Sequence, residues 1–199
     1  MTHRDDIRIA VDAGADAIGI IFHPHSPRYV APSDAGNLLQ AVPAGVARVA
    51  VGVDWTEARI REIESYGTFD YWQLHGSESP SLARTFRPRR LIKAFGLPRP
   101  GVAEEASSYD VEAFLLDKAS VRHGGTGEAF DWNLAVDFIR SNKRPVLLSG
   151  GLRADNVEQA LKLVQPWGVD VCSGVEVRPG RKNPDTLATF IRLCRQHFK

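Results

Sequence analysis

The sequence predicts an α/β fold in which parallel strands alternate with helices. Short apolar runs rich in β-branched residues alternate with amphipathic segments along the whole chain. Several of the runs, such as VARVAVGV and PVLLSG, are largely apolar and show no alternation with polar residues. Strands of this kind are buried on both faces, which is typical of a parallel sheet covered by helices. The spacing is tight and no composition shift interrupts it, so we expect residues 1–199 to form a single domain.

The chain opens with MTHRDDIRIAVDAGADAIGIIF, which predicts a helix followed directly by a strand. Thr2 is a residue type favoured at a helix N-cap, and Asp5 suits the positive end of the helix dipole. Gly14 is a typical helix stop. The protein is therefore expected to begin with a helix in front of its first visible strand.

The remaining elements follow in regular order. Apolar runs predict strands over residues 17–22, 47–53, 71–74, 91–94, 113–116, 145–148 and 169–172. Amphipathic segments predict further helices over residues 32–42, 56–66, 79–86, 101–107, 132–141, 154–164 and 185–198. The order is compatible with an open doubly wound sheet or with a closed barrel. A (β/α)8 TIM barrel needs eight strands and eight helices, and this chain supplies every helix but lacks the first strand, which would precede Thr2.

Composition excludes several classes of function. The net charge of +1 creates no field that would attract nucleic acid or an acidic membrane surface. No run approaches the roughly 18 apolar residues of a membrane span, and no basic-then-apolar leader pattern is visible. The two cysteines, Cys172 and Cys194, have neither disulfide-framework nor metal-site spacing and are expected to be reduced thiols. We therefore expect a cytoplasmic protein that acts on a small molecule.

Polar residues stand at the carboxyl ends of the predicted strands, where the active sites of parallel α/β folds lie. Asp117 ends FLLD, His75 follows WQL, and Arg28 lies in the loop after the first visible strand. A partly desolvated Asp117 would suit a general acid, although an aspartate that hydrogen-bonds loop amides fits its position equally well. Arg28 has the planar fork that suits a carboxylate or phosphate, although a surface salt bridge is the usual fate of a lone arginine. His75 is either a substrate contact or a satisfied, partly buried histidine. Asp170 in the last strand needs a partner if it points inward, either a substrate amine or a neighbouring lysine.

Two pairs of small residues follow the last two strands. Gly150 and Gly151 end LLSGG, and Ser173 and Gly174 follow DVC. Each pair alone indicates only a tight turn, but glycine also lets backbone N–H groups approach an anion closely. Because barrels frequently bind phosphate between the loops after their last two strands, the two pairs together favour a phosphate site.

The motifs SPRY, QLHG, LLD followed by GGTG and FDW, SGGL, and DVCSGVE occur here in one order. In this combination the chain resembles the phosphoribosylanthranilate isomerase family of tryptophan biosynthesis over almost its whole length. The resemblance implies a (β/α)8 barrel that carries out an Amadori rearrangement of N-(5-phosphoribosyl)anthranilate, with no cofactor and no metal. The related isomerase of histidine biosynthesis runs the same rearrangement on a similar barrel, but SPRY and QLHG argue against it.

The resemblance also implies roles for individual residues. Asp117 matches the general acid that opens the ribose ring, and Arg28 matches the arginine that binds the anthranilate carboxylate. Four residues match the phosphate loops, namely Gly150, Gly151, Ser173 and Gly174. Three further residues match positions that line the substrate pocket, namely Gln73, His75 and Asp170. A phosphoribosyl substrate is the expected partner of a monomer or homodimer, and neither nucleic acid nor membrane is expected.

One part of the family pattern is missing. The family's first strand ends in a Lys-Ile-Cys-Gly-x-Thr motif whose cysteine is the general base, and only Met1 and Thr2 match its last two positions. The base is therefore expected upstream of Met1. Neither cysteine of the chain matches it, and Cys172 is expected to serve packing. The alternative is a phosphosugar-binding homologue that lacks the base and does not catalyse.

Overall fold

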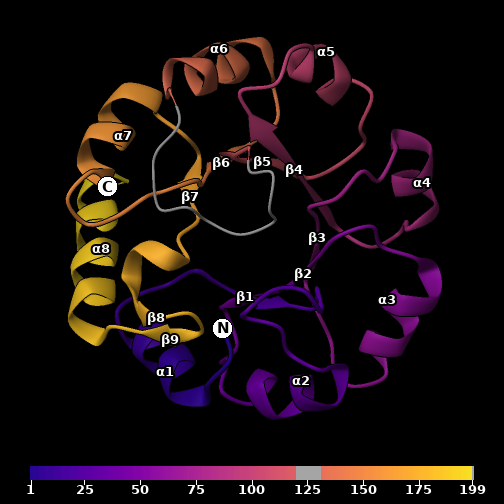
Figure 1. Cartoon of the computed structure of the whole chain (residues 1–199), viewed down its shortest axis with the longest axis vertical. Helices are drawn as coiled ribbons and strands as arrows, with labels where there is room; N and C mark the ends of the chain where they lie inside the picture. Colours follow the sequence, from indigo (N-terminus) through magenta and orange to yellow (C-terminus); the bar gives the residue numbers. More distant parts are fainter. Residues whose placement is uncertain (120–130, 199) are drawn as a thin grey trace.

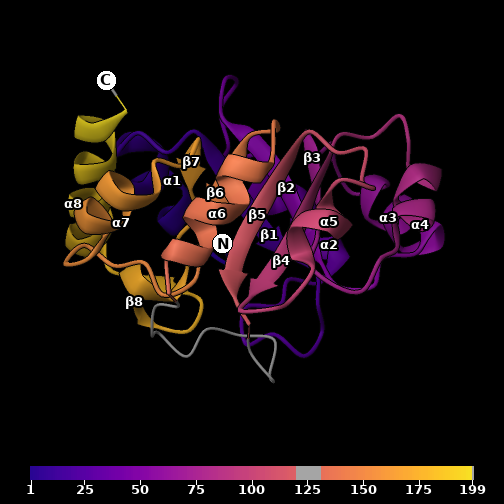
Figure 2. The same cartoon turned by 90° about the horizontal axis from the view of Figure 1, so that it is seen from above.

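The computed structural model describes residues 1–119 and 131–198, and it places seven parallel strands inside a ring of helices (Figure 1). The strands pair in chain order, each with the next. They are β1 (Ala17–Ile21), β2 (Ala47–Gly52), β3 (Tyr71–Leu74), β4 (Leu91–Leu97), β5 (Ala113–Lys118), β6 (Val146–Leu148) and β7 (Gly168–Val169). Turned by 90°, the molecule shows the strands running side by side, with helices flanking them (Figure 2). The predicted parallel α/β barrel is therefore confirmed, with seven of the eight strands of a closed barrel among the described residues.

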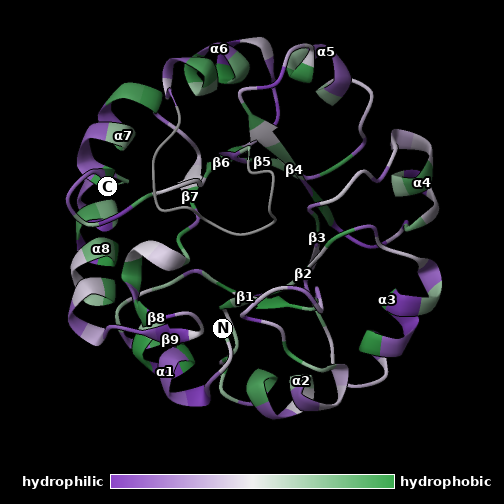
Figure 3. Ribbon diagram, viewed as in Figure 1, coloured by the Kyte–Doolittle hydropathy of each residue, from purple (hydrophilic) through white to green (hydrophobic). Residues whose placement is uncertain are grey.

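The helices cover the outside of the sheet. They are α1 (Arg4–Asp12), α2 (Pro32–Leu39), α3 (Glu57–Glu64), α4 (Pro80–Thr85), α5 (Val102–Ala106), α6 (Asn133–Ser141), α7 (Val157–Val164) and α8 (Pro184–His197). Their apolar and polar residues are segregated on the ribbon, as amphipathic helices require (Figure 3). No helix in the described part of the chain is long and apolar enough to cross a membrane.

Alternate residues of strands β2 to β6 face two different cores. On β5, Phe114 and Leu116 belong to the large core between strands and helices, whereas Ala113 and Leu115 belong to a smaller cluster inside the barrel. Both faces are thus buried, which explains the uninterrupted apolar runs of the sequence. Because side chains alternate along a strand, Asp117 continues the inward-facing series of Ala113 and Leu115.

The barrel is not closed by strand pairing between β7 and β1, and we call this region the seam. Asp16 and Phe22 hydrogen-bond to β2, so the alternation of a parallel strand turns the Gly19 carbonyl away from β2. The Met1 nitrogen donates to that carbonyl, which places the start of the chain along the open edge of β1. On the other side of the seam, a short 3-10 helix, η1 (Ser173–Val175), leads into the hairpin β8 (Glu176–Arg178) and β9 (Arg181–Lys182).

Three local predictions need correction. The first helix begins at Arg4 with His3 as its N-cap, and the Thr2 hydroxyl instead donates to the Gly180 carbonyl of the β8–β9 turn, so Thr2 is not the helix cap. The last strand of the sheet covers only Gly168–Val169, and Asp170 follows it. The hairpin was not predicted, because two strands of three and two residues leave no readable alternation.

Candidate active site

Asp117 lies at the carboxyl end of β5 and meets a side chain from β3. Its Oδ2 is 3.3 Å from Nε2 of His75, and Nδ1 of His75 is 3.1 Å from Oε1 of Gln73. Gln73 is buried, while His75 and Asp117 are each about one-third exposed. Gln73 thus anchors the imidazole from below, and the imidazole holds the carboxyl group at the mouth of the barrel. The structure thus brings Asp117 beside a pair of residues more than 40 positions earlier in the sequence.

Asp117 also has a direct contact with its own loop, because its Oδ1 accepts a hydrogen bond of 2.7 Å from the Lys118 amide. One carboxylate oxygen therefore accepts a backbone amide, as the second interpretation of its sequence position expected, and the other faces His75. The general-acid role stays a prediction. The glycine-rich segment that follows, including the GGTG motif, lies outside the described residues.

Asp170 points into the same mouth from the end of β7. Its Oδ2 accepts a hydrogen bond of 3.1 Å from the hydroxyl of buried Ser149. Its surroundings raise the pKa of the Asp170 carboxyl, first by desolvation and then by the negative charge of Asp117, although the side chain still reaches solvent through the mouth. The structure thus gives Asp170 a serine at the end of β6 as a hydrogen-bond partner, a residue type that the sequence analysis did not name.

The two predicted phosphate loops are packed against each other. A Cβ on Gly174 would stand 1.9 Å from the Leu152 carbonyl oxygen, so η1 touches the loop after β6. Gly150 has a φ of +80°, and a Cβ there would meet the Lys118 amide nitrogen at 2.5 Å and Asp117 Oδ1 at 3.1 Å. Glycine at 150 is therefore required by both conformation and space. The four predicted residues therefore lie in two loops that contact each other, and Gly150 of one loop lies against Asp117. Gly151 also has a positive φ, and Ser173 opens η1.

Arg28 crosses the seam to the β8 strand. Its Nε lies 3.0 Å from both carboxylate oxygens of Glu176, and its Nη2 lies 2.6 Å from Oε2. The side chains of Arg28 and Glu176 are 12% and 4% exposed. The hydrogen bond to Glu176 is the largest influence on Arg28 and raises its pKa further, so the guanidinium keeps its charge.

Lys182 and Cys172 complete this cluster. The Lys182 ammonium donates to the Cys172 carbonyl at 2.8 Å and to Glu176 Oε1 at 3.3 Å. The Cys172 thiol lies 3.8 Å from the same Oε1. Cys172, which was expected to serve packing, is half-buried and lies in this polar cluster. Burial raises the pKa of the Cys172 thiol, which keeps it protonated.

Sequence reasoning missed Lys182 and gave no role to Glu176. Glu176 was visible as part of SGVE, but its partner Arg28 lies 148 positions earlier in the chain. Lys182 stands in the basic segment VRPGRKNP, which carries no sign that one of its charges is buried. Only the hairpin turns this lysine inward.

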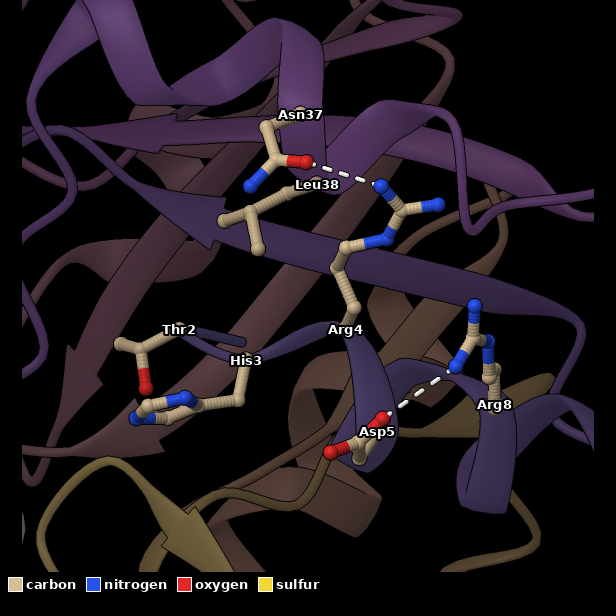
Figure 4. A pocket seen from close by; sticks show the side chains of 7 residues that line it. All are labelled: Thr2, His3, Arg4, Asp5, Arg8, Asn37 and Leu38. Atoms are coloured by element: carbon tan, nitrogen blue, oxygen red, sulfur yellow. Dashed lines mark hydrogen bonds and ion pairs between the residues drawn. The ribbon is translucent and has the colours of Figure 1, made fainter.

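A surface hollow lies elsewhere, between the start of α1 and α2 (Figure 4). Arg4 spans it with a hydrogen bond of 2.9 Å to Asn37, and Arg8 pairs with Asp5 beside it. No predicted site residue lines this hollow. The candidate active site is therefore the polar mouth at the carboxyl ends of the strands.

Comparisons with known proteins find similar sequences over almost the whole length of the chain. A family model described as N-(5'-phosphoribosyl)anthranilate (PRA) isomerase matches residues 1–193. The chain is 40% identical over 193 residues to the N-(5'-phosphoribosyl)anthranilate isomerase of Thermotoga petrophila, covering 96% of this chain and 94% of that protein. It is 42% identical over 199 residues to the enzyme of the same name from Desulforudis audaxviator, covering 98% and 95%.

Solved structures of proteins with the same name are also similar to this chain. The crystal structure of phosphoribosyl anthranilate isomerase from Thermotoga maritima superposes with a TM-score of 0.91 at 37% identity, covering 98% of this chain and 96% of that one. A complex of such an isomerase with reduced 1-(o-carboxyphenylamino)-1-deoxyribulose 5-phosphate superposes with a TM-score of 0.87 at 36% identity, covering 98% and 95%.

Proposed function

The chain belongs to the N-(5'-phosphoribosyl)anthranilate isomerase family, and we propose from the geometry of its mouth how it catalyses that isomerisation. The observation that carries the proposal is the position of Asp117, which faces the interior of the barrel 3.3 Å from His75 and against the Gly150 backbone. A carboxyl group lies there beside a surface suited to a phosphate, which is the combination that an acid-catalysed rearrangement of a phosphosugar requires.

The Amadori rearrangement assigns one task to each part of the mouth. Asp117 gives its proton to the ring oxygen of the ribose while the bond from that oxygen to C1 breaks, which leaves an iminium group between C1 and the anthranilate nitrogen. A base then removes the proton from C2, and the electron pair of that bond neutralises the iminium. The resulting enolamine gains a proton at C1 and loses one from the C2 hydroxyl, which yields the ketose.

Substrate binding falls to the two sides of the mouth. The backbone N–H groups around Gly150, Gly151, Ser173 and Gly174 bind the phosphate, and Arg28 binds the anthranilate carboxylate. Gln73, His75 and Asp170 line the space between, where the ribose hydroxyls lie. The reaction uses only proton transfers and needs neither cofactor nor metal.

The family resemblance assigns removal of the C2 proton to a cysteine on the first strand of a complete barrel, and the place of such a strand in this fold is the seam. Its place is supported by Met1, which already bonds to the free edge of β1. Cys172 is a poor substitute, because the raised pKa of its thiol leaves little of the reactive thiolate. The protein acts in the cytoplasm as a monomer or homodimer; a relative from Thermotoga maritima is described as dimeric.

Loss of substrate fluorescence tests the activity, with residues 1–199 and with a form extended by the sequence encoded directly upstream. The extended form is expected to turn over N-(5-phosphoribosyl)anthranilate, and residues 1–199 to bind it with far lower turnover. Binding without turnover by both forms would favour a phosphosugar-binding homologue. Equal turnover by both forms would refute the proposed base.

Asp117→Asn tests the acid in the extended form. It is expected to lower kcat by about 10²–10⁴-fold while the affinity for the reduced product analogue stays within about twofold. A matching loss of affinity would instead assign Asp117 to substrate binding.

A further inference from the structure

The cluster around Arg28 contains two further charged side chains, Glu176 and Lys182, although an arginine alone can bind a carboxylate. Glu176 accepts bonds from Arg28, Lys182, the Gly180 amide and the Cys172 thiol. Lys182 is buried, with its side chain 5% exposed. Burying three ionised side chains carries a large desolvation cost, and the surrounding hydrogen bonds offset it only when they are this complete.

The geometry at Arg28 divides its donors into two sets. Glu176 takes Nε–H and one proton of Nη2 along one side of the guanidinium. The plane of the group directs the two Nη1 protons and the second Nη2 proton toward its end, and Glu176 does not use them. A substrate carboxylate can therefore pair with that end while Glu176 keeps the side, so the two anions bind one guanidinium together.

The charges of the cluster explain the presence of Lys182. An Arg28–Glu176 pair alone is neutral and would attract a carboxylate weakly. Lys182 adds a positive charge, so the three side chains carry one net positive charge beneath the mouth. The thiol of Cys172 adds none in its protonated form.

We propose, on the basis of the proposed function, that Glu176 and Lys182 are positioning residues that set the specificity of the enzyme for a substrate bearing an aromatic carboxylate. Glu176 fixes the direction of the Arg28 fork, and Lys182 keeps the cluster positively charged. Neither residue touches the sugar or takes part in proton transfer.

Two probes separate specificity from general damage: the reduced product analogue and the same molecule without its carboxyl group. Glu176→Gln is expected to lower the affinity for the carboxylated probe by about 10-fold, the size of a lost charge-assisted interaction. It is expected to lower the affinity for the other probe by less than about twofold. In turnover the loss is expected in KM, with kcat changed by less than about threefold. An equal loss of affinity for both probes would overturn the proposal. So would an affinity ratio between the two probes that stays the same or shifts further toward the carboxylated one.

Glu64→Gln is the matched control. Glu64 accepts hydrogen bonds from Nε and Nη2 of Arg89 at 2.6 and 2.8 Å, through the same side of the guanidinium. This pair joins the end of α3 to the segment just before β4, away from the carboxyl ends of the strands. The variant is expected to leave the affinities for both probes unchanged.

Binding of the carboxyl-free probe shows whether Glu176→Gln is folded. If it is not, variants of Lys182 provide an independent test. Lys182→Met keeps the Arg28–Glu176 pair and removes one charge, and it is expected to weaken only the carboxylated probe. Lys182→Arg is expected to restore most of that affinity, and failure of both expectations would refute the role of Lys182. Absence of turnover and of binding by the unaltered protein would refute the proposed function itself, a result distinct from all of these.

Discussion

The arc from β1 to β6 and the seam between β7 and β1 are stabilised by different kinds of contact. In the arc, each strand pairs with its neighbour in a parallel ladder, and large side chains such as Trp72, Phe114 and Leu115 are almost fully buried. Across the seam, no ladder joins the strands among the described residues, and buried charged groups connect its two sides. The arc is therefore held by strand ladders and apolar packing. The seam has no ladder, and hydrogen bonds between groups far apart in the sequence supplement the packing of α1 against α8 there.

The comparison also separates the two halves of the candidate site. Asp117, His75 and Gln73 stand on the arc, where paired strands fix their positions. Arg28, Glu176 and Lys182 stand beside the seam, on a loop and a small hairpin. In the proposed mechanism, proton transfer therefore uses residues on paired strands, whereas recognition of the carboxylate uses residues positioned by side-chain contacts.

The largest effect is expected from a cavity in the arc. Phe114→Ala removes a side chain that is 1% exposed and packs against Phe95 and Phe138, so the free energy of unfolding should fall by about 3–5 kcal/mol. Urea denaturation measures the change. Leu82→Ala, at a side chain that is 38% exposed, is the control and should stay within about 0.5 kcal/mol. Similar losses at both sites would contradict a packed arc.

A smaller effect is expected at the seam. The buried Asp6 carboxylate accepts from the Lys182 amide at 3.0 Å and pairs with Arg181 at 3.4 Å, which ties α1 to β9. Asp6→Asn should lower the free energy of unfolding by about 1–3 kcal/mol, measured in the same urea assay. Asp5→Asn, on the exposed side of the same helical turn, should cost less than about 1 kcal/mol. If Asp5→Asn cost as much, the loss would reflect the helix dipole and not the seam.

The contribution of Glu176 should depend on pH. Burial acts to raise the pKa of its carboxyl, but the hydrogen bonds and charges of Arg28 and Lys182 outweigh burial and lower it below 4.5, the value expected in the unfolded chain. The unfolded state therefore binds more protons, so this stabilisation is present above pH 4.5 and is lost as the pH falls through the lower folded value. The difference in unfolding free energy between wild type and Glu176→Gln should shrink as the pH falls below 4.5. A difference that stays constant with pH would contradict the charged pair.

The smallest effect is expected for an ion pair on the surface of the arc. Arg59 and Glu62 lie one turn apart on α3 at 2.6 Å, and Glu62 is 48% exposed. Glu62→Gln should change the free energy of unfolding by about 0.2–1 kcal/mol, since water and salt screen such pairs. Urea denaturation at low and high ionic strength measures this change. A larger change would contradict the expectation that buried charged pairs at the seam contribute more than exposed pairs.

The sequence by itself determined the parallel α/β fold, because apolar runs and amphipathic helices express contacts that repeat every few residues. It also determined the order of the strand ends, which is why Asp117, His75 and the glycine pairs could be proposed as neighbours before the fold was known. The full length of β7, the hairpin after it and the cap of α1 were not readable, since their residues are placed by contacts across the seam.

Only the tertiary structure decided which charges meet. Arg28 and Glu176 are 148 positions apart, and Asp6 and Lys182 are 176 apart, so no local pattern links either pair. Ring closure brings the two ends of the chain together, and the exclusion of water there converts ordinary surface residue types into a buried charged cluster. That step depends on the whole fold, which is why the carboxylate-binding side of the mouth becomes visible only in three dimensions.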